Sequence, residues 1–131
     1  MNVDAQAFAA EWIAAWNSRD LERVLSHYST DIVFLSPIAQ AVVGDGRVIG
    51  ISALRSYWGQ ALAARPDLKF ELLDVLVGHE CLTVLYRNHR GQHAAETFEF
   101  GADGKIVRSF ACYGQLSHAP IISTCCWALV R

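Results

Sequence analysis

The chain has 131 residues and a formal net charge of -2, a length that suits one domain with a single core. Hydrophobic residues make up 53% of it and charged residues only 18%, so we expect some apolar surface to line an internal pocket or to be covered by a partner subunit. Lysine and arginine form no run, which argues against nucleic-acid binding.

Membrane insertion and secretion are not expected either. The N-terminal sequence lacks the basic region and the apolar core of a signal peptide, and no apolar run approaches the ~20 residues that span a bilayer. The four cysteines show no metal-ligand spacing and are predicted to be free thiols. We therefore expect a cytoplasmic protein.

Two amphipathic helices are predicted at the N-terminal end. Apolar residues recur at helical spacing from Asp4 to Trp16, and Asp4 can cap this helix. Asp20 can cap a second helix, whose apolar positions run to Tyr28. The two helices are expected to form an antiparallel hairpin.

A strand, a loop and a third helix are predicted next. Residues 32–35 are β-like, and residues 37–50, which hold three glycines, are predicted to be a long loop. Within that loop, residues 41–43 can pair as a short edge strand. The third helix is predicted from Gly50 or Ser52 to about Ala64, ahead of an Arg-Pro pair.

From residue 68 onward the apolar residues alternate with a period of two, which predicts strands. Four strands are expected at residues 68–77, 81–88, 92–100 and 106–115, joined by turns that each hold a glycine. Helices followed by an antiparallel meander indicate an α+β fold with helices on one face of a curved sheet.

The sequence shows no repeat or linker, so residues 1–117 are predicted to form a single domain. Residues 118–131 are too apolar to extend freely into water. We expect this tail either to cover the domain's own core or dimer face, or to close the pocket mouth as a flap.

Side-chain alternation indicates which strand residues face the interior. Phe98 and Phe100 mark the inner face of one strand, which places Glu96 on that face, and Tyr86 and Asn88 share the inner face of the strand before it. In the last strand the predicted inner residues are Val107, Ser109, Ala111 and Tyr113. The predicted outer residues are Ile106, Arg108, Phe110 and Cys112, of which Phe110 and Cys112 are expected to face a partner subunit.

One carboxyl group, that of Glu96, is thus expected among aromatic side chains. Such surroundings disfavour the ionised form, so its pKa should rise, as suits a general acid or base. The alternative is that Glu96 only hydrogen-bonds Tyr28, Tyr86 or Asn88 within the core. The predicted ligand-binding residues are Trp12, Trp16, Tyr28, Phe34, Ser36, Trp58, Tyr86, Asn88, Phe98, Ser109 and Tyr113, with Glu96 as the catalytic residue.

No metal and no cofactor are predicted. The five histidines have no partner at metal-ligand spacing, and the glycines at 44, 46 and 50 follow no dinucleotide-binding pattern. Ser36 stands in Leu-Ser-Pro and not in a nucleophile elbow, so it is expected to act as a hydrogen-bonding residue of the pocket.

Four segments, residues 12–20, 28–37, 50–58 and 96–107, resemble the SnoaL-like and ketosteroid-isomerase-like members of the nuclear-transport-factor-2-like (NTF2-like) superfamily. The resemblance covers residues 4 to about 117. It implies a cone-shaped curved sheet wrapped around three helices, as in a cystatin-like α+β barrel, with a deep apolar pocket and usually a homodimer formed through the sheet. This fold hosts isomerases, cyclases, epoxide hydrolases, dehydratases and binding proteins.

The resemblance also argues against ketosteroid isomerisation itself. The general-base aspartate of the steroid isomerases falls on Ser36, their oxyanion-hole tyrosine on Trp12 and their protonated aspartate on Glu96. Two supporting aromatic positions fall on Tyr28 and Trp58. A serine without a base cannot remove a proton next to a carbonyl group.

We therefore predict a homodimeric SnoaL-like domain that holds a hydrophobic small molecule in an aromatic pocket. If it is an enzyme, Glu96 is the acid/base of a cofactor-free isomerisation, cyclisation, dehydration or hydrolysis, and Tyr28, Tyr86 and Asn88 orient it or a water. The alternative is a non-catalytic ligand-binding or dimerisation module. A third hypothesis is a partner-binding subunit whose apolar sheet face contacts a different chain.

Overall fold

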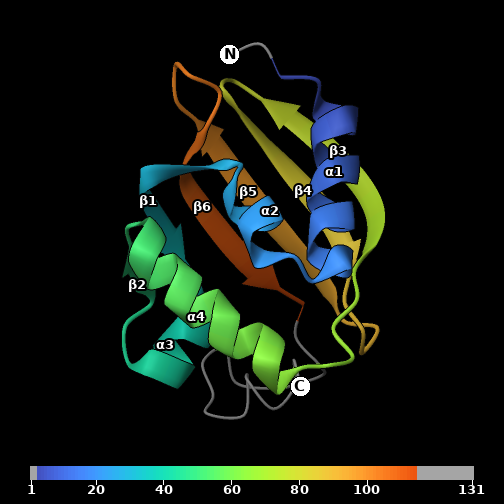
Figure 1. The fold of residues 1–131 in the computed structure, drawn as a ribbon. Helices are drawn as coiled ribbons and strands as arrows, with labels where there is room; N and C mark the ends of the chain where they lie inside the picture. The colour runs from blue at the N-terminus through green and yellow to red at the C-terminus, as the bar shows by residue number, and fades with distance from the viewer. Residues whose placement is uncertain (1–2, 115–131) are drawn as a thin grey trace.

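The computed structural model describes residues 3–114 as helices in front of a curved sheet (Figure 1). The elements in chain order are α1 (Ala5–Ser18), α2 (Leu21–Leu25), β1 (Tyr28–Leu35), α3 (Pro37–Val43), β2 (Arg47–Ile49), α4 (Ile51–Ala64), β3 (Glu71–Gly78), β4 (Cys81–Arg87), β5 (His93–Phe100) and β6 (Ile106–Tyr113). The predictions for the tail, residues 118–131, lie outside the described residues. No helix within residues 3–114 is long and apolar enough to cross a membrane.

Within residues 3–114 the sheet has six strands in the order β2-β1-β6-β5-β4-β3 and does not close into a barrel. Strands β3 to β6 form the predicted antiparallel meander. Strand β1 pairs with β6 in parallel and with β2 antiparallel. In Figure 1, α1 crosses the β3–β4 side of the sheet and α4 the β1–β6 side. The predicted α+β class with a curved sheet and helices on one face is confirmed.

Hydrogen bonds join the C-terminal ends of α1 and α4, and this contact positions the aromatic residues of the core. Arg19 ends α1 in the left-handed conformation with φ 64°. Its guanidinium donates to the carbonyl oxygens of Leu62 and Arg65 at the end of α4. Trp16 and Trp58 therefore meet edge to face, with ring centroids 4.9 Å apart.

The second helix is shorter than predicted. It ends at Leu25, and Tyr28 begins a strand and does not end the helix. The reason is tertiary pairing, because the His27 carbonyl accepts a hydrogen bond of 2.9 Å from the Ile106 N–H at the start of β6. Tyr28 nevertheless turns its ring into the core, where it is 5% exposed.

The predicted long loop, residues 37–50, holds a short helix and an edge strand. Ser36 caps α3, since its hydroxyl oxygen accepts a hydrogen bond of 3.1 Å from the Ile38 N–H, and Pro37 occupies the first turn, where its missing N–H costs nothing. Gly44 ends the helix with φ 83°. The edge strand is therefore β2 and not residues 41–43.

Alternation places the inner face correctly: Tyr86 on β4, Asn88 directly after β4, and Glu96 and Phe98 on β5 are all buried. Strand β6 departs from the prediction at its start. Ile106, predicted to face outward, is fully buried. Glu99 pairs with Arg108 but Phe100 pairs with Ile106, so β6 has one extra residue, a β-bulge, between these pairs. The bulge reverses which residues of β6 face inward on its two sides. Beyond the bulge, Ser109 and Ala111 face inward as predicted.

Candidate active site

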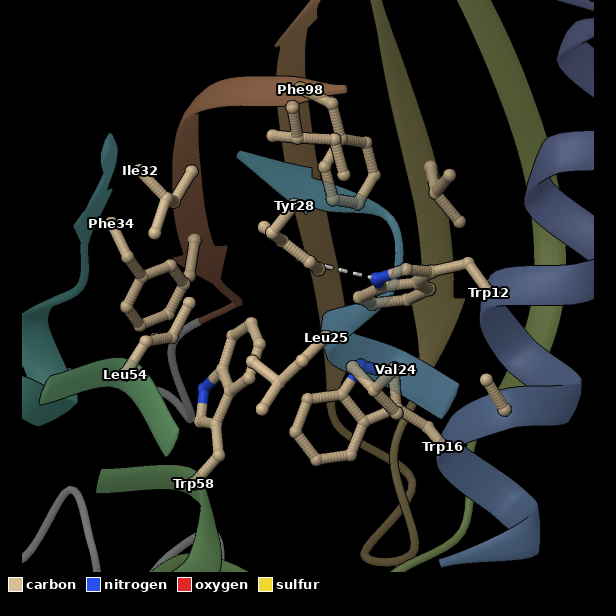
Figure 2. Close-up of a cluster of buried hydrophobic side chains, with 14 of the residues drawn as sticks. Trp12, Trp16, Val24, Leu25, Tyr28, Ile32, Phe34, Leu54, Trp58 and Phe98 are labelled. Atoms are coloured by element: carbon tan, nitrogen blue, oxygen red, sulfur yellow. Dashed lines mark hydrogen bonds between the residues drawn. The ribbon is translucent and has the colours of Figure 1, made fainter. Parts of the chain in front are cut away.

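A cavity of about 60 Å³ lies where α1, α4 and the inner face of the sheet meet. Figure 2 shows Trp12 and Trp16 on α1 and Trp58 on α4 converging on the buried cluster beside Tyr28 and Phe98. The residues that line the cavity are Trp12, Trp16, Phe34, Ile38, Tyr57, Trp58, Ala61, Arg65, Leu68, Phe70, Tyr86, Asn88, Glu96 and Tyr113.

Most of the predicted ligand-binding residues therefore line one cavity, and the others lie outside its lining. Tyr28 sits behind it, where its hydroxyl oxygen accepts a hydrogen bond of 3.1 Å from the Trp12 indole N–H (Figure 2). Phe98 is fully buried, and Ser109 is buried beside Glu96. Ser36 lines a second, more open hollow between α3, β2 and β6.

Glu96 is the carboxyl group of this cavity. Its side chain points inward from the middle of β5, the residue is 3% exposed, and one carboxyl oxygen accepts a hydrogen bond of 2.8 Å from the Ser109 hydroxyl on β6. Burial raises the pKa of Glu96 to about 7, and the Ser109 hydrogen bond opposes part of that rise. Near neutral pH both the acid and the base are thus populated, which general acid–base catalysis requires.

Asn88 lines the cavity, and its side-chain amide makes hydrogen bonds within the β4–β5 hairpin. Its Nδ2 donates to Gln92 Oε1 at 2.9 Å, and its Oδ1 accepts from the N–H groups of Arg90 and Gln92, each at 3.0 Å. These three hydrogen bonds hold the amide to the β4–β5 hairpin. Within residues 3–114, the hydrogen bond to Glu96 comes from Ser109 and not from Tyr28, Tyr86 or Asn88.

A group of hydroxyls shares the cavity with Glu96. Burial is the main cause that raises the pKa values of Tyr57, Tyr86 and Tyr113, and the Glu96 charge raises them further. Contacts of Ser36 with Tyr57 and Tyr113 act in the opposite direction and lower the pKa values of these two tyrosines. These tyrosines stay neutral at physiological pH, so each keeps an O–H that can donate to an oxygen atom.

Several wall residues were not predicted. Tyr57 lies on the predicted apolar side of the third helix, but helical spacing does not tell which part of that side meets a cavity. Phe70 precedes β3 and is held by Asn17, whose amide exchanges hydrogen bonds of 2.9 and 2.8 Å with the Phe70 backbone. The sequence identifies Arg65 only as the residue that ends the third helix before Pro66. Its Arg-Pro context gives no signal of a cavity.

Residues 3–114 hold no group of three or more His, Cys, Asp or Glu side chains placed to bind a metal ion. Cys81 and Cys112 are free thiols in the described part of the chain.

Comparisons with known proteins agree on the fold. A crystal structure of a SnoaL-like protein of unknown function from Burkholderia thailandensis is 39% identical, with a TM-score of 0.83, over 85% of this chain and 94% of that chain. AclR from Streptomyces galilaeus, a proposed hydroxylase, is 25% identical with a TM-score of 0.66, over 84% and 88% of the two chains.

A proposed isomerase of the SnoaL-like family from Agrobacterium tumefaciens is 16% identical with a TM-score of 0.68, over 85% of this chain and 97% of that chain, which shows a shared fold alone. No curated protein matches the chain. The SnoaL-like domain itself matches residues 9–109, most of the chain. This protein therefore belongs to the SnoaL-like family, with its NTF2-like fold.

Proposed function

We propose that this protein binds a small, largely apolar molecule in the aromatic cavity and acts on it by acid–base catalysis at Glu96, without a cofactor. The observation that carries the proposal is a carboxyl group with a pKa of about 7 in the wall of that cavity. Perturbed carboxyl groups of this kind gather at catalytic sites because proton transfer is most efficient when the pKa lies near the working pH.

The site supports proton transfer within one molecule, as in isomerisation, cyclisation or dehydration. The Glu96 carboxylate removes a proton from a carbon beside a carbonyl group, and the resulting carboxylic acid returns that proton to another atom of the substrate. Negative charge develops on the carbonyl oxygen in between. Tyr57, Tyr86 and Tyr113 line the same cavity, and their hydroxyls are candidate hydrogen-bond donors to that oxygen.

The cavity volume limits what enters without rearrangement. A space of 60 Å³ is well below the roughly 150 Å³ of a cavity that binds benzene. A ring-sized ligand therefore requires some aromatic wall residues to change rotamer. We expect the ligand to displace water next to Glu96 and to push the rings of Trp16 and Trp58 apart.

Turnover and binding should be measured on hydrophobic carbonyl compounds, polyketides and epoxides, with Glu96→Gln as the test variant. Glu99→Gln is the matched control, because Glu99 lies on the same strand but faces outward toward Arg108. We expect Glu96→Gln to bind a converted compound and to lose its conversion, with Glu99→Gln unaffected. Full turnover by Glu96→Gln would exclude the catalytic role, and binding without conversion by the native protein would favour the non-catalytic module.

We also propose a homodimer formed through the outer face of the sheet. Two rows of paired residues support it: Leu76, Thr83, Thr97 and Phe110, and beside them Asp74, Leu85, Ala95 and Cys112. Charged pairs flank these rows, Arg87 with Glu71 at 3.3 Å and Arg108 with Glu99 at 3.7 Å. Leu76, Leu85, Ala95 and Phe110 supply apolar side chains to these rows, and apolar side chains inside a charged rim are the usual composition of a protein interface.

A further inference from the structure

Two buried hydrogen-bond donors in the wall of the cavity lack an acceptor. The indole N–H of Trp16 and the Nε–H of Arg65 have no hydrogen-bond partner in the described part of the chain. Trp16 is 5% exposed, and the Arg65 side chain is 14% exposed. Buried N–H groups are nearly always paired, so unpaired ones mark a place for an acceptor atom that the described residues do not supply.

Both residues line the cavity that holds Glu96. Trp16 lies in the last turns of α1, and Arg65 follows the last residue of α4. Arg19 joins these two helix ends through the carbonyl oxygens of Leu62 and Arg65. The fold therefore brings the two donors to the same side of the cavity.

The guanidinium of Arg65 is only partly neutralised. One Nη donates to the Asp67 carboxylate at 2.8 Å, but that carboxylate is 58% exposed, so water screens its charge. The same Nη lies 3.3 Å from Nε2 of the buried His89 ring. The Nε edge thus presents a positive charge and an unused donor to the cavity, an arrangement that suits an anionic oxygen.

The remainder of the cavity wall is aromatic. Phe70 stacks on Trp12 with ring centroids 5.8 Å apart, and Tyr86 packs against Phe70 at 4.5 Å. A flat, unsaturated body fits between such rings better than a flexible or polar one.

We propose that the natural ligand is a small unsaturated or aromatic acid, whose carboxylate binds Arg65 Nε and the Trp16 N–H while its unsaturated body reaches Glu96. This inference rests on the proposed function and adds the chemical class of the substrate. The carboxylate of the ligand contributes to binding and does not react, and the reacting atoms of the ligand lie beside Glu96.

Matched pairs of probes test the inference. Benzoate, cinnamate and 2-naphthoate are each compared with the corresponding primary amide, which has nearly the same shape and no charge. Dissociation constants are measured by isothermal titration calorimetry on the native full-length protein. We expect at least one acid to bind ~10-fold or more tightly than its amide, the effect of a charge-assisted hydrogen bond in a buried site.

Variants of Arg65 and Trp16 test whether these residues cause the preference for the acid over the amide. Arg65→Gln should lower the affinity for the acid to that for the amide, and the retained affinity for the amide shows that the cavity is still folded. Arg55→Gln is the matched control, because Arg55 pairs with Glu22 on the surface, away from the cavity. Trp16→Phe, which keeps a ring but loses the N–H, should weaken the binding of both acid and amide.

Equal affinity for acid and amide across all three pairs would overturn the inference, and so would an acid preference that survives in Arg65→Gln. The proposed function fails differently. If a neutral compound is converted in a Glu96-dependent reaction while no acid is preferred, the acid–base function stands and only the substrate class is wrong.

Discussion

Ser109 on β6 donates a hydrogen bond of 2.8 Å to Glu96 on the neighbouring strand β5, and both residues are buried. Ser109 is paired with Phe98, so it reaches Glu96 diagonally across the inner face of the sheet. The bond favours the ionised carboxylate, and it is therefore the contact that holds the pKa of Glu96 near 7 and prevents a further rise.

Replacing Ser109 with alanine should raise the pKa of Glu96 above its native value, because the carboxylate loses its hydrogen-bond donor while its burial persists. The measurement is a ¹³C NMR titration of the Glu96 side-chain carboxyl in both proteins. Thr97→Val serves as control, since the Thr97 hydroxyl is bonded to Thr83 at 2.8 Å on the outer face. An unchanged midpoint in Ser109→Ala would show that the bond does not tune Glu96.

The titration of Glu96 should make the free energy of unfolding depend on pH. Its pKa rises from 4.5 to about 7 on folding, so between these values the folded state binds more protons than the unfolded state. The contribution of Glu96 to the free energy of unfolding therefore has its full value below pH 4.5. It falls as the pH rises toward 7, by about 3 kcal/mol in total.

Chemical denaturation at pH 5 and pH 8 tests this expectation on the native protein and Glu96→Gln. Other carboxyl groups, such as Glu11 and Asp67, have lowered pKa values and the opposite dependence. The difference between the two proteins removes their contribution. We expect the variant to gain stability relative to the native protein on going from pH 5 to pH 8, and a difference that does not vary with pH would contradict the account.

The Trp12–Tyr28 hydrogen bond should stabilise the core behind the cavity. Its length is 3.1 Å, and both residues are buried. A double-mutant cycle with Trp12→Phe and Tyr28→Phe isolates the bond from the loss of ring volume. We expect a coupling free energy of about 1 kcal/mol in urea denaturation. Additive effects of the two substitutions would mean that the bond contributes nothing to stability.

The proposed dimer should depend on the outer face of the sheet. Light scattering during size-exclusion chromatography should give twice the chain mass of 14.5 kDa. Phe110→Lys, at the β6 end of the outer rows, should give a monomer because it would bury an unpaired charge. Val77→Lys is the control, since Val77 is 69% exposed but pairs with Leu82 of the inner face. A monomeric native protein would contradict the proposal.

The periodicity of the sequence predicts the features that are determined by residues close together in the chain. The helix cap at Asp4 and the inward position of Glu96 follow from local spacing, and both are observed. The cap at Ser36 also had a local signal, because Ser-Pro is a common start of a helix.

The features that local patterns do not predict depend on contacts between residues distant in sequence. The helical period runs on through Tyr28, but pairing of His27 with β6 draws the chain into a strand. The parallel pairing of β1 with β6 and the shift that buries Ile106 depend on register, which alternation does not specify. The cavity-lining role of Arg65 depends on where the end of α4 meets α1, and no spacing within either helix reports that contact.

The central claim is that the sheet holds Glu96 as a carboxyl group that exchanges its proton near neutral pH. Titration of the ¹³C-labelled Glu96 side chain in the native protein tests it without knowledge of the substrate, with Glu96→Gln used to assign the signal. The account predicts a midpoint at about pH 7. A midpoint at the ordinary value of 4.5 would contradict it, because Glu96 would then be permanently ionised in the working range.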